Sequence, residues 1–221
     1  MVASAPSYEG IVAGLRTANE PLEPDGQRYA LTLLRTLAEG EPVSAAMLAE
    51  RTGQLPAEAA AFIDRLPGIY RDDDGRVIGM WGLAVTEFPP HRYRIDDRQL
   101  FTWCAWDPFI LTDWLGGTAE VSSVDAHTKE PVGFRLEDGR VVDLSHPGLA
   151  LSFKLVEEWT SDVIGSFCHF VHYFTDERSA RVWTDTRPGT FVLSLDDAIT
   201  LGQVGGRQVF PDLDPATDAS Q

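Results

Sequence analysis

The chain has few cysteines, few basic residues and no long apolar run. Its 221 residues include only two cysteines, Cys104 and Cys168. Two are too few for the disulfide framework of a small secreted protein, and in the cytosol both would stay reduced. No stretch approaches the roughly 18 to 20 uninterrupted apolar residues of a membrane span, and residues 1–10 lack the segments of a signal peptide. We therefore expect a cytoplasmic protein with no membrane partner.

Positive charge is also scarce. The sequence has 18 Lys and Arg against 34 Asp and Glu, which leaves a net charge of -16. Such a surface repels phosphate backbones and anionic membranes, so the charge argues against nucleic acid as a partner. The hydrophobic content of 43% is enough to bury a core.

The N-terminal third carries the signals of three helices. Clustered leucines at helical spacing predict a helix near residues 27–39. Ser44 suits the N-cap of a second helix, which Gly53 ends. Pro56 suits the first turn of a third, running to Leu66.

A hairpin is expected after these helices, because strand-like residues flank the turn at residues 72–75. Residues 27–87 therefore predict a winged-helix-like domain, preceded by an N-terminal extension with a short helix over residues 1–26. Such domains often bind DNA, but residues 41–80 contain four Arg against seven acidic residues. Phosphate contact requires the opposite sign. A scaffold or lid role is the favoured interpretation.

In residues 88–210, short strand-like runs alternate with turn residues, which predicts a strand-rich mixed α/β domain. The expected fold class is therefore α+β. Asp176 or Thr175 is a candidate cap for one late helix, and Ser194 with Asp197 resembles a capping box for another that ends before Gly202. The tail, residues 211–221, is expected to be disordered. The predicted strands of this domain are Tyr93–Ile95, Ala119–Ser123, Val132–Leu136, Arg140–Leu144 and Leu149–Leu155.

Cys104 and Asp107 form the first candidate reactive pair. A carboxylate three residues after a cysteine lies on the same face of a helix, where it can accept the thiol proton. A neighbouring thiolate in turn raises the pKa of the carboxyl group, which suits it to store a proton. Pro108 disfavours helical geometry at Asp107 and would make it an N-cap. Taken alone, the spacing favours an inert buried cysteine beside a capping or surface aspartate.

The second candidate is the run from Ser166 to Phe174. Strand alternation would place Cys168 and His172 on one face, together with Phe170. No second Cys or His pair with zinc spacing accompanies them. His169 and His172 are therefore interpreted as residues of the surrounding shell or as ordinary structural histidines. No Walker loop, serine nucleophile elbow or dinucleotide fingerprint occurs, so no nucleotide cofactor is indicated.

Both runs resemble the alkylmercury lyase family. The first is Ile95-Asp96-Asp97-Arg98-Gln99-Leu100 followed by Phe101-Thr102-Trp103-Cys104-Ala105-Trp106-Asp107, and the second is Ser166-Phe167-Cys168 followed by Val171-His172-Tyr173-Phe174. The resemblance extends over residues 27–204. It implies that Cys104, Asp107 and Cys168 are the catalytic residues and that the cysteines, with Asp107, hold mercury. Trp103, Trp106, Phe167 and Phe170 are then candidates for a dry pocket.

The chain departs from the family at several positions. Family members often carry further cysteines where this chain has Val124, Asp125 and His169, and Pro108 is another difference. The three implied catalytic residues are all present.

The resemblance implies protonolysis of a carbon-mercury bond. Mercury is soft and prefers thiolates. The implied partners are an organomercurial substrate, small thiols for turnover and a mercuric reductase that takes the product. Two alternatives remain, a winged-helix regulator that binds a heavy metal or organometal and a relative that binds mercury without cleaving the bond.

Overall fold

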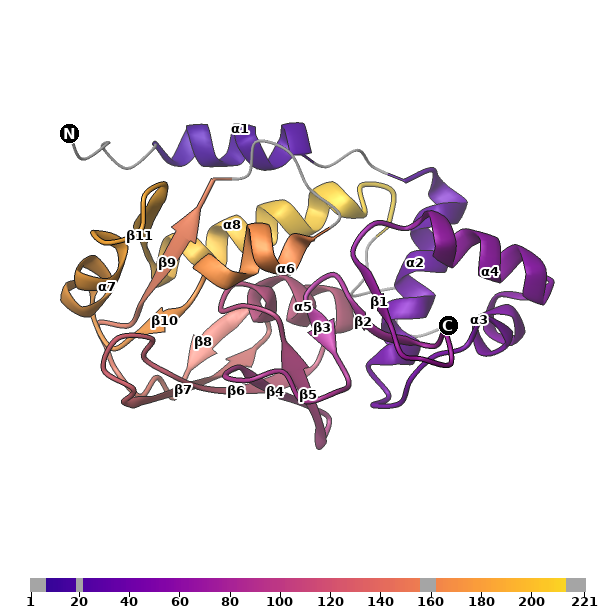
Figure 1. The fold of residues 1–221 in the computed structure, drawn as a ribbon, viewed down its shortest axis with the longest axis horizontal. Helices are drawn as coiled ribbons and strands as arrows, with labels where there is room; N and C mark the ends of the chain where they lie inside the picture. The colour runs from indigo at the N-terminus through magenta and orange to yellow at the C-terminus, as the bar shows by residue number, and fades with distance from the viewer. Residues whose placement is uncertain (1–6, 19–21, 156–161, 214–221) are drawn as a thin grey trace.

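The computed structural model describes residues 7–18, 22–155 and 162–213. The fold is α+β, with helices first and antiparallel sheets with further helices after them (Figure 1). The N-terminal helices are α1 (Tyr8–Ala18), α2 (Pro24–Leu37), α3 (Ala45–Thr52) and α4 (Pro56–Arg65). The later helices are α5 (Asp107–Leu115), α6 (Val163–Ser166), the 3-10 helix η1 (Cys168–Phe170), α7 (Glu177–Thr184) and α8 (Leu195–Val209).

The capping signals predicted for the early helices are confirmed. The Ser44 hydroxyl accepts a hydrogen bond from the backbone N–H of Met47 at the start of α3. Gly53 ends α3 in the left-handed conformation, and Pro56 lies in the first turn of α4. Helix α2 begins at Pro24, a few residues before the predicted start, because proline is well suited to a first helical turn.

An eight-stranded antiparallel sheet forms the larger layer, in the order β1-β2-β3-β5-β4-β6-β7-β8. Leu83 in β3 pairs with Thr102 in β5, so strands on both sides of residue 87 belong to one sheet. The strands are β1 (Ile69–Arg71), β2 (Val77–Met80), β3 (Leu83–Ala84), β4 (Arg92–Ile95), β5 (Arg98–Thr102), β6 (Thr118–Val124), β7 (Pro131–Glu137) and β8 (Arg140–Val142).

Burial along the central strands follows the pattern that identifies a strand in the sequence. Every second residue of β6 and β7 is buried, as the period of two requires. Strand β5 is not among the predicted strands, because its last three residues are all buried and it shows no alternation. It leads directly to Cys104.

A smaller sheet, in the order β10-β9-β11, lies beside the larger one and is followed by α8 (Figure 1). Its strands are β9 (Ala150–Lys154), β10 (Tyr173–Phe174) and β11 (Thr190–Ser194). Asp176 caps α7 and Ser194 caps α8, as predicted. The prediction that this last helix ends before Gly202 is wrong, since α8 continues to Val209. Its glycines give room for α5, and a Cβ on Gly202 would lie 2.7 Å from the Cβ of Phe109.

The C-terminal end of the described chain is bonded to helix α2. The backbone N–H of Asp212 donates to the Gln27 side chain at 3.2 Å, and the Gln27 amide donates to the Asp212 carboxylate at 2.8 Å. The rest of the predicted disordered tail, residues 214–221, lies outside the described residues. Helix α1 packs against α8 (Figure 1). No helix in the described ranges is long and apolar enough to cross a membrane.

Candidate active site

Cys104 lies in the loop that joins β5 to α5. Its backbone carbonyl accepts a hydrogen bond from the Thr102 hydroxyl at 3.1 Å. The next residue, Ala105, donates its N–H to the carbonyl of Val171 at 3.1 Å, which ties this loop to the segment after Cys168. The Cys104 side chain is fully buried. The loop is therefore held from two sides, and the thiol faces the interior.

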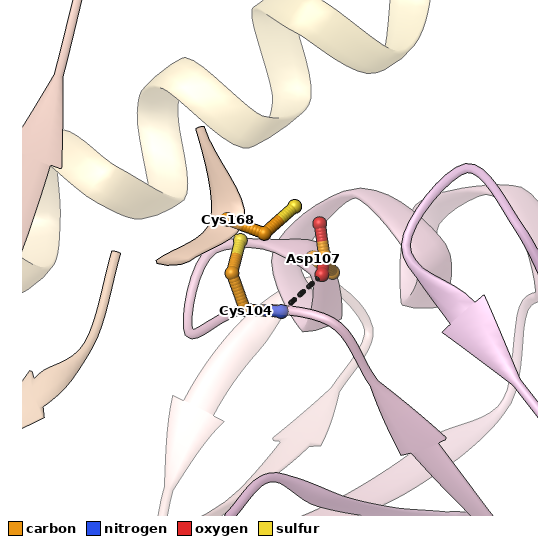
Figure 2. Close-up of side chains that lie close together, drawn as sticks. All are labelled: Cys104, Asp107 and Cys168. Atoms are coloured by element: carbon orange, nitrogen blue, oxygen red, sulfur yellow. Dashed lines mark hydrogen bonds between the residues drawn. The ribbon is translucent and has the colours of Figure 1, made fainter. Parts of the chain in front are cut away.

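Asp107 is the first residue of α5, and Trp106 occupies the N-cap position. One carboxyl oxygen accepts the backbone N–H of Cys104 at 2.6 Å (Figure 2). The prediction that Cys104 and Asp107 share a helical face is therefore wrong, because the helix starts only at Asp107. Pro108 fits the first turn, where its missing N–H costs nothing. The carboxyl group folds back over the loop instead.

Cys168 opens the 3-10 helix η1, and not the strand that the sequence predicts. The Phe170 N–H donates to the Phe167 carbonyl at 2.8 Å, and the Val171 N–H donates to that of Cys168 at 3.1 Å. These local turns use backbone N–H and C=O groups that, in a strand, would form hydrogen bonds with an adjacent strand. Only Tyr173 and its successor pair with β9. The expected common face of Cys168 and His172 is therefore absent.

The three side chains nevertheless meet. The sulfur atoms of Cys104 and Cys168 and a carboxylate oxygen of Asp107 all lie within 4.8 Å of one another (Figure 2). Their exposed fractions are 0%, 3% and 7%. Among the described residues this is the only group of three or more Cys, His, Asp or Glu side chains close enough to share a metal ion. Two thiols and one carboxyl group suit a soft metal together with a proton.

Burial dominates the electrostatics of the carboxyl group. It raises the pKa of Asp107 to about 7, against hydrogen bonds from the backbone and side chain of Cys104 and from the backbone of Trp103, which lower it. Near neutral pH, Asp107 can therefore either hold or release a proton.

The thiols influence each other. Burial, a hydrogen bond to Cys168 and the charge of Asp107 raise the pKa of Cys104 well above its ordinary value. The hydrogen bond with Cys104 lowers the pKa of Cys168, but burial and the charge of Asp107 outweigh it, so this pKa is raised as well. Both cysteines are free thiols. An arriving metal would therefore meet two protonated sulfurs whose protons need an acceptor.

The histidines lie outside this group. His169 is exposed, and its carbonyl oxygen lies 2.9 Å from Nε2 of His172. The His172 ring packs against Trp183 and stacks on His91, and burial lowers its pKa to about 4. Neither histidine lies in the group of possible metal ligands.

The aromatic residues next to the reactive residues in the sequence pack against other aromatic rings. The Trp106 ring centroid lies 5.3 Å from Phe153 and 6.1 Å from Phe167. Trp103 packs edge-on against Tyr70 of β1 at 4.9 Å. Phe170, by contrast, belongs to a separate cluster with Trp183.

Sequence reasoning missed two polar neighbours of the site. The Tyr173 hydroxyl is fully buried and has no hydrogen-bond partner among the described residues. Burial raises the pKa of Tyr173 well above its ordinary value, and the charges of Cys104 and Asp107 add to the effect. Burial raises the pKa of Tyr70, and the charges of Asp162 and Cys168 add to the effect. Tyr173 stands in the second cysteine motif. Its place beside the site, like that of Tyr70, depends on long-range packing that no local pattern predicts.

Comparisons with known proteins agree on one family. The family model described as alkylmercury lyase matches residues 86–204. An alkylmercury lyase of Bacillus cereus is 34% identical over 175 residues, which cover 79% of this chain and 78% of the relative. One from Pseudomonas putida is 31% identical over 202 residues, which cover 91% and 93%.

A solved structure shares the fold. The crystal structure of the mercury-bound form of MerB2 superposes with a TM-score of 0.72 over 91% of this chain and 96% of that one, at 20% identity. At that identity the likeness concerns the fold alone. The family match confirms the resemblance inferred from the two cysteine motifs: the chain belongs to the alkylmercury lyase family of enzymes.

Proposed function

We propose that Cys104, Asp107 and Cys168 carry out the protonolysis of a carbon-mercury bond in an organomercurial substrate. The observation that carries this proposal is the buried group of two thiols and one carboxyl group within 4.8 Å. Each member has a separate task, since the sulfurs bind mercury and the carboxyl group moves a proton. The substrate class is the one that the family implies, and two thiol ligands fit it, because mercury is soft and prefers sulfur to oxygen and nitrogen ligands.

The proposed reaction balances with these three groups alone. An organomercurial R–Hg–X and two thiols give the hydrocarbon RH, Hg(II) bound to two thiolates, and HX. The two Hg–S bonds replace the Hg–C and Hg–X bonds, and no atom changes its oxidation state. One thiol proton leaves with X, and the other reaches the carbon.

Asp107 transfers the thiol proton that reaches the carbon. Its carboxylate accepts the proton of Cys104 as the first Hg–S bond forms, and Cys168 then adds as the second thiolate. Electron donation from two sulfurs makes the bound carbon more basic, and the protonated Asp107 delivers its proton to that carbon. A pKa of about 7 suits both the acceptance and the delivery of a proton near neutral pH.

Mercury must then leave the two cysteines. Small thiols exchange with the bound thiolates and regenerate Cys104 and Cys168, and a mercuric reductase is the proposed recipient of the product. The need for reduced cysteines and for small thiols supports a cytoplasmic location. No organic cofactor takes part in the proposed reaction.

The surroundings of the three residues have supporting roles in this proposal. Trp103, Trp106 and Phe167 exclude water and accept the organic group of the substrate, while His169 and His172 remain candidates for indirect support. Helices α2 to α4 with β1 and β2 form a winged-helix-like domain (27–87) used as a scaffold, and residues 88–210 form the catalytic domain.

The proposal is tested by incubating the reduced protein with phenylmercuric acetate and excess small thiol and measuring benzene by gas chromatography. Sustained release is expected from the wild-type protein. Cys104→Ala, Cys168→Ala and Asp107→Asn should each lose a factor of about a hundred or more, which corresponds to about 3 kcal/mol of barrier. His127→Ala, at an exposed position outside the reactive group and its named surroundings, is the control. Mercury binding without benzene release from the wild-type protein would contradict the proposal.

A further inference from the structure

The turn between β2 and β3 has an unfavourable sequence for its shape. Its two residues, Trp81 and Gly82, have φ values of 48° and 96°. Two-residue hairpins of this kind favour Asn-Gly, and a bulky residue with positive φ is strained. The Trp81 ring packs against Trp114 at 6.0 Å and Phe210 at 5.8 Å, and its indole N–H donates to the Pro67 carbonyl at 2.9 Å. Tertiary packing therefore holds this turn in place.

Gly82 in this turn lies directly against the Asp107 carboxyl group. A Cβ placed on Gly82 would lie 2.5 Å from Cγ, 2.6 Å from Oδ1 and 2.8 Å from Cβ of Asp107. Real Cβ atoms essentially never come this close to another heavy atom. Only glycine leaves room for the carboxyl group where it is.

The opposite side of the carboxyl group is fixed as well. Its Oδ2 accepts the Cys104 N–H at 2.6 Å, while the Gly82 carbonyl accepts the N–H of Trp103 at 2.9 Å. The turn and the carboxyl group are thus bonded to consecutive residues of one loop. Asp107 has the Cys104 amide on one side and the bare Cα of Gly82 on the other.

We propose that Gly82 is a positioning residue that holds the Asp107 carboxyl group against Cys104 and Cys168. The catalytic consequence of this contact rests on the proposed function. Gly82 precedes the stretch that matches the family model, residues 86–204, and belongs to the N-terminal hairpin. That hairpin therefore forms one wall of the proton-transfer site.

Gly82→Ala tests the role, with Gly40→Ala as the matched control. Gly40 has a φ of 99°, nearly that of Gly82, and a Cβ there would meet nothing within 4 Å. Both substitutions carry the backbone strain, but only the first displaces Asp107. We expect Gly82→Ala to bind Hg(II) as tightly as the wild-type protein while releasing benzene about ten- to a hundredfold more slowly in a single turnover. Benzene release at the Gly40→Ala rate would overturn the proposal.

A double-mutant cycle keeps the contact testable whatever the activity. Asp107→Gly removes the three atoms that lie nearest to the new Cβ, so Gly82→Ala should destabilise this background less than it destabilises the wild-type protein in urea unfolding. If Gly82→Ala alone fails to fold, the double variant should regain a cooperative transition. Equal destabilisation in both backgrounds, or a double variant that also fails to fold, would refute the contact. A wild-type protein that releases no benzene would remove the proposed function and leave this cycle to decide the contact.

Discussion

Asp107 is subject to opposing influences at the scale of the single residue. Burial favours its protonated form, whereas hydrogen bonds from Cys104 and Trp103 favour the carboxylate, and the balance raises its pKa to about 7. An ordinary aspartate, with a pKa near about 3.9, would be a poor proton carrier at neutral pH. The position of the carboxyl group thus bears directly on the proposed chemistry.

The pH dependence of catalysis follows from this balance. Asp107 must be ionised to accept the thiol proton, so kcat/KM should rise as the pH increases through about 7 and then level off. Asp107→Asn should have a low activity with no such step. The measurement is benzene release at low substrate concentration across this range. If the wild-type profile has no midpoint in this region, or if Asp107→Asn keeps the same midpoint, Asp107 is not the group that accepts the thiol proton.

Ionisation of Asp107, which the proposed reaction requires, should lower the stability of the folded protein. The pKa of Asp107 is raised in the folded protein, so its contribution to stability is full below the unfolded value of about 3.9 and is lost as the pH rises through about 7. Asp107→Asn avoids this loss. At about pH 8 its free energy of unfolding should exceed that of the wild-type protein by a few kcal/mol, and by less at about pH 4. Urea unfolding at both pH values measures the difference.

Asp125 provides a control of opposite sign. It is fully buried, but although burial would raise its pKa, hydrogen bonds from Thr175, Thr128, Ser179 and His127 lower it. Asp125→Asn should therefore destabilise the protein at neutral pH. Equal effects of the two substitutions would show that the pKa of Asp107 is not raised in the way described.

The identities of the reactive residues could be predicted from the sequence, but their geometry could not. Cys104, Asp107 and Cys168 stand in recognisable motifs, and these motifs indicate the chemistry. The approach of Gly82 to Asp107 and the buried hydroxyl of Tyr173 depend on residues far apart in the chain. No local pattern marks such contacts.

At the scale of the element, predictions from local signals succeeded where a few neighbouring residues determine the structure. The caps of α3, α7 and α8 follow short-range rules, and β6 and β7 follow strand alternation. The segment from Cys168 to Phe174 has the alternation of a strand, yet its first residues turn into η1. Local bonds from Phe170 to Phe167 and from Val171 to Cys168 form this turn, so the alternation of side chains does not decide the backbone here.

In helix α8, packing reverses the effect that a glycine-to-alanine substitution usually has on stability. In an exposed helix, replacing glycine by alanine stabilises by about 0.5 to 1 kcal/mol. At Gly202 the new Cβ would lie 3.2 Å from the backbone carbon of Phe109, which cannot move aside easily. We therefore expect Gly202→Ala to lower the free energy of unfolding by about 1 to 3 kcal/mol. Gly10→Ala in α1, where the nearest atom lies at 3.4 Å, is the control in thermal unfolding, and an equal gain at both sites would contradict this account.

At the scale of the whole molecule, one sheet joins the N-terminal and C-terminal parts. The pairing of β3 with β5 brings the early hairpin to the loop of Cys104. The α+β class could be predicted from the order of helical and strand signals. This pairing could not, because sequence patterns do not specify which strands are neighbours. The division at residue 87 remains a prediction.

The net charge of -16 argues against the DNA-binding regulator, because a negative surface repels phosphate backbones. The expected recognition helix α4 carries Glu58 and Asp64, which would repel phosphates. We expect no retarded band in a gel-shift experiment with DNA from upstream of the gene at physiological salt, with or without Hg(II). A basic winged-helix repressor on its own operator is the positive control. A specific shift would favour the regulator alternative.

The central claim is that two thiols and one carboxyl group suffice for protonolysis. The most direct measurement is a single turnover with phenylmercuric acetate in the absence of small thiols, followed by titration of the remaining free thiols. The account predicts one benzene per protein molecule and the loss of both free thiols, Cys104 and Cys168, to bound Hg(II). Loss of the thiols without benzene, or benzene with both thiols still free, would contradict it.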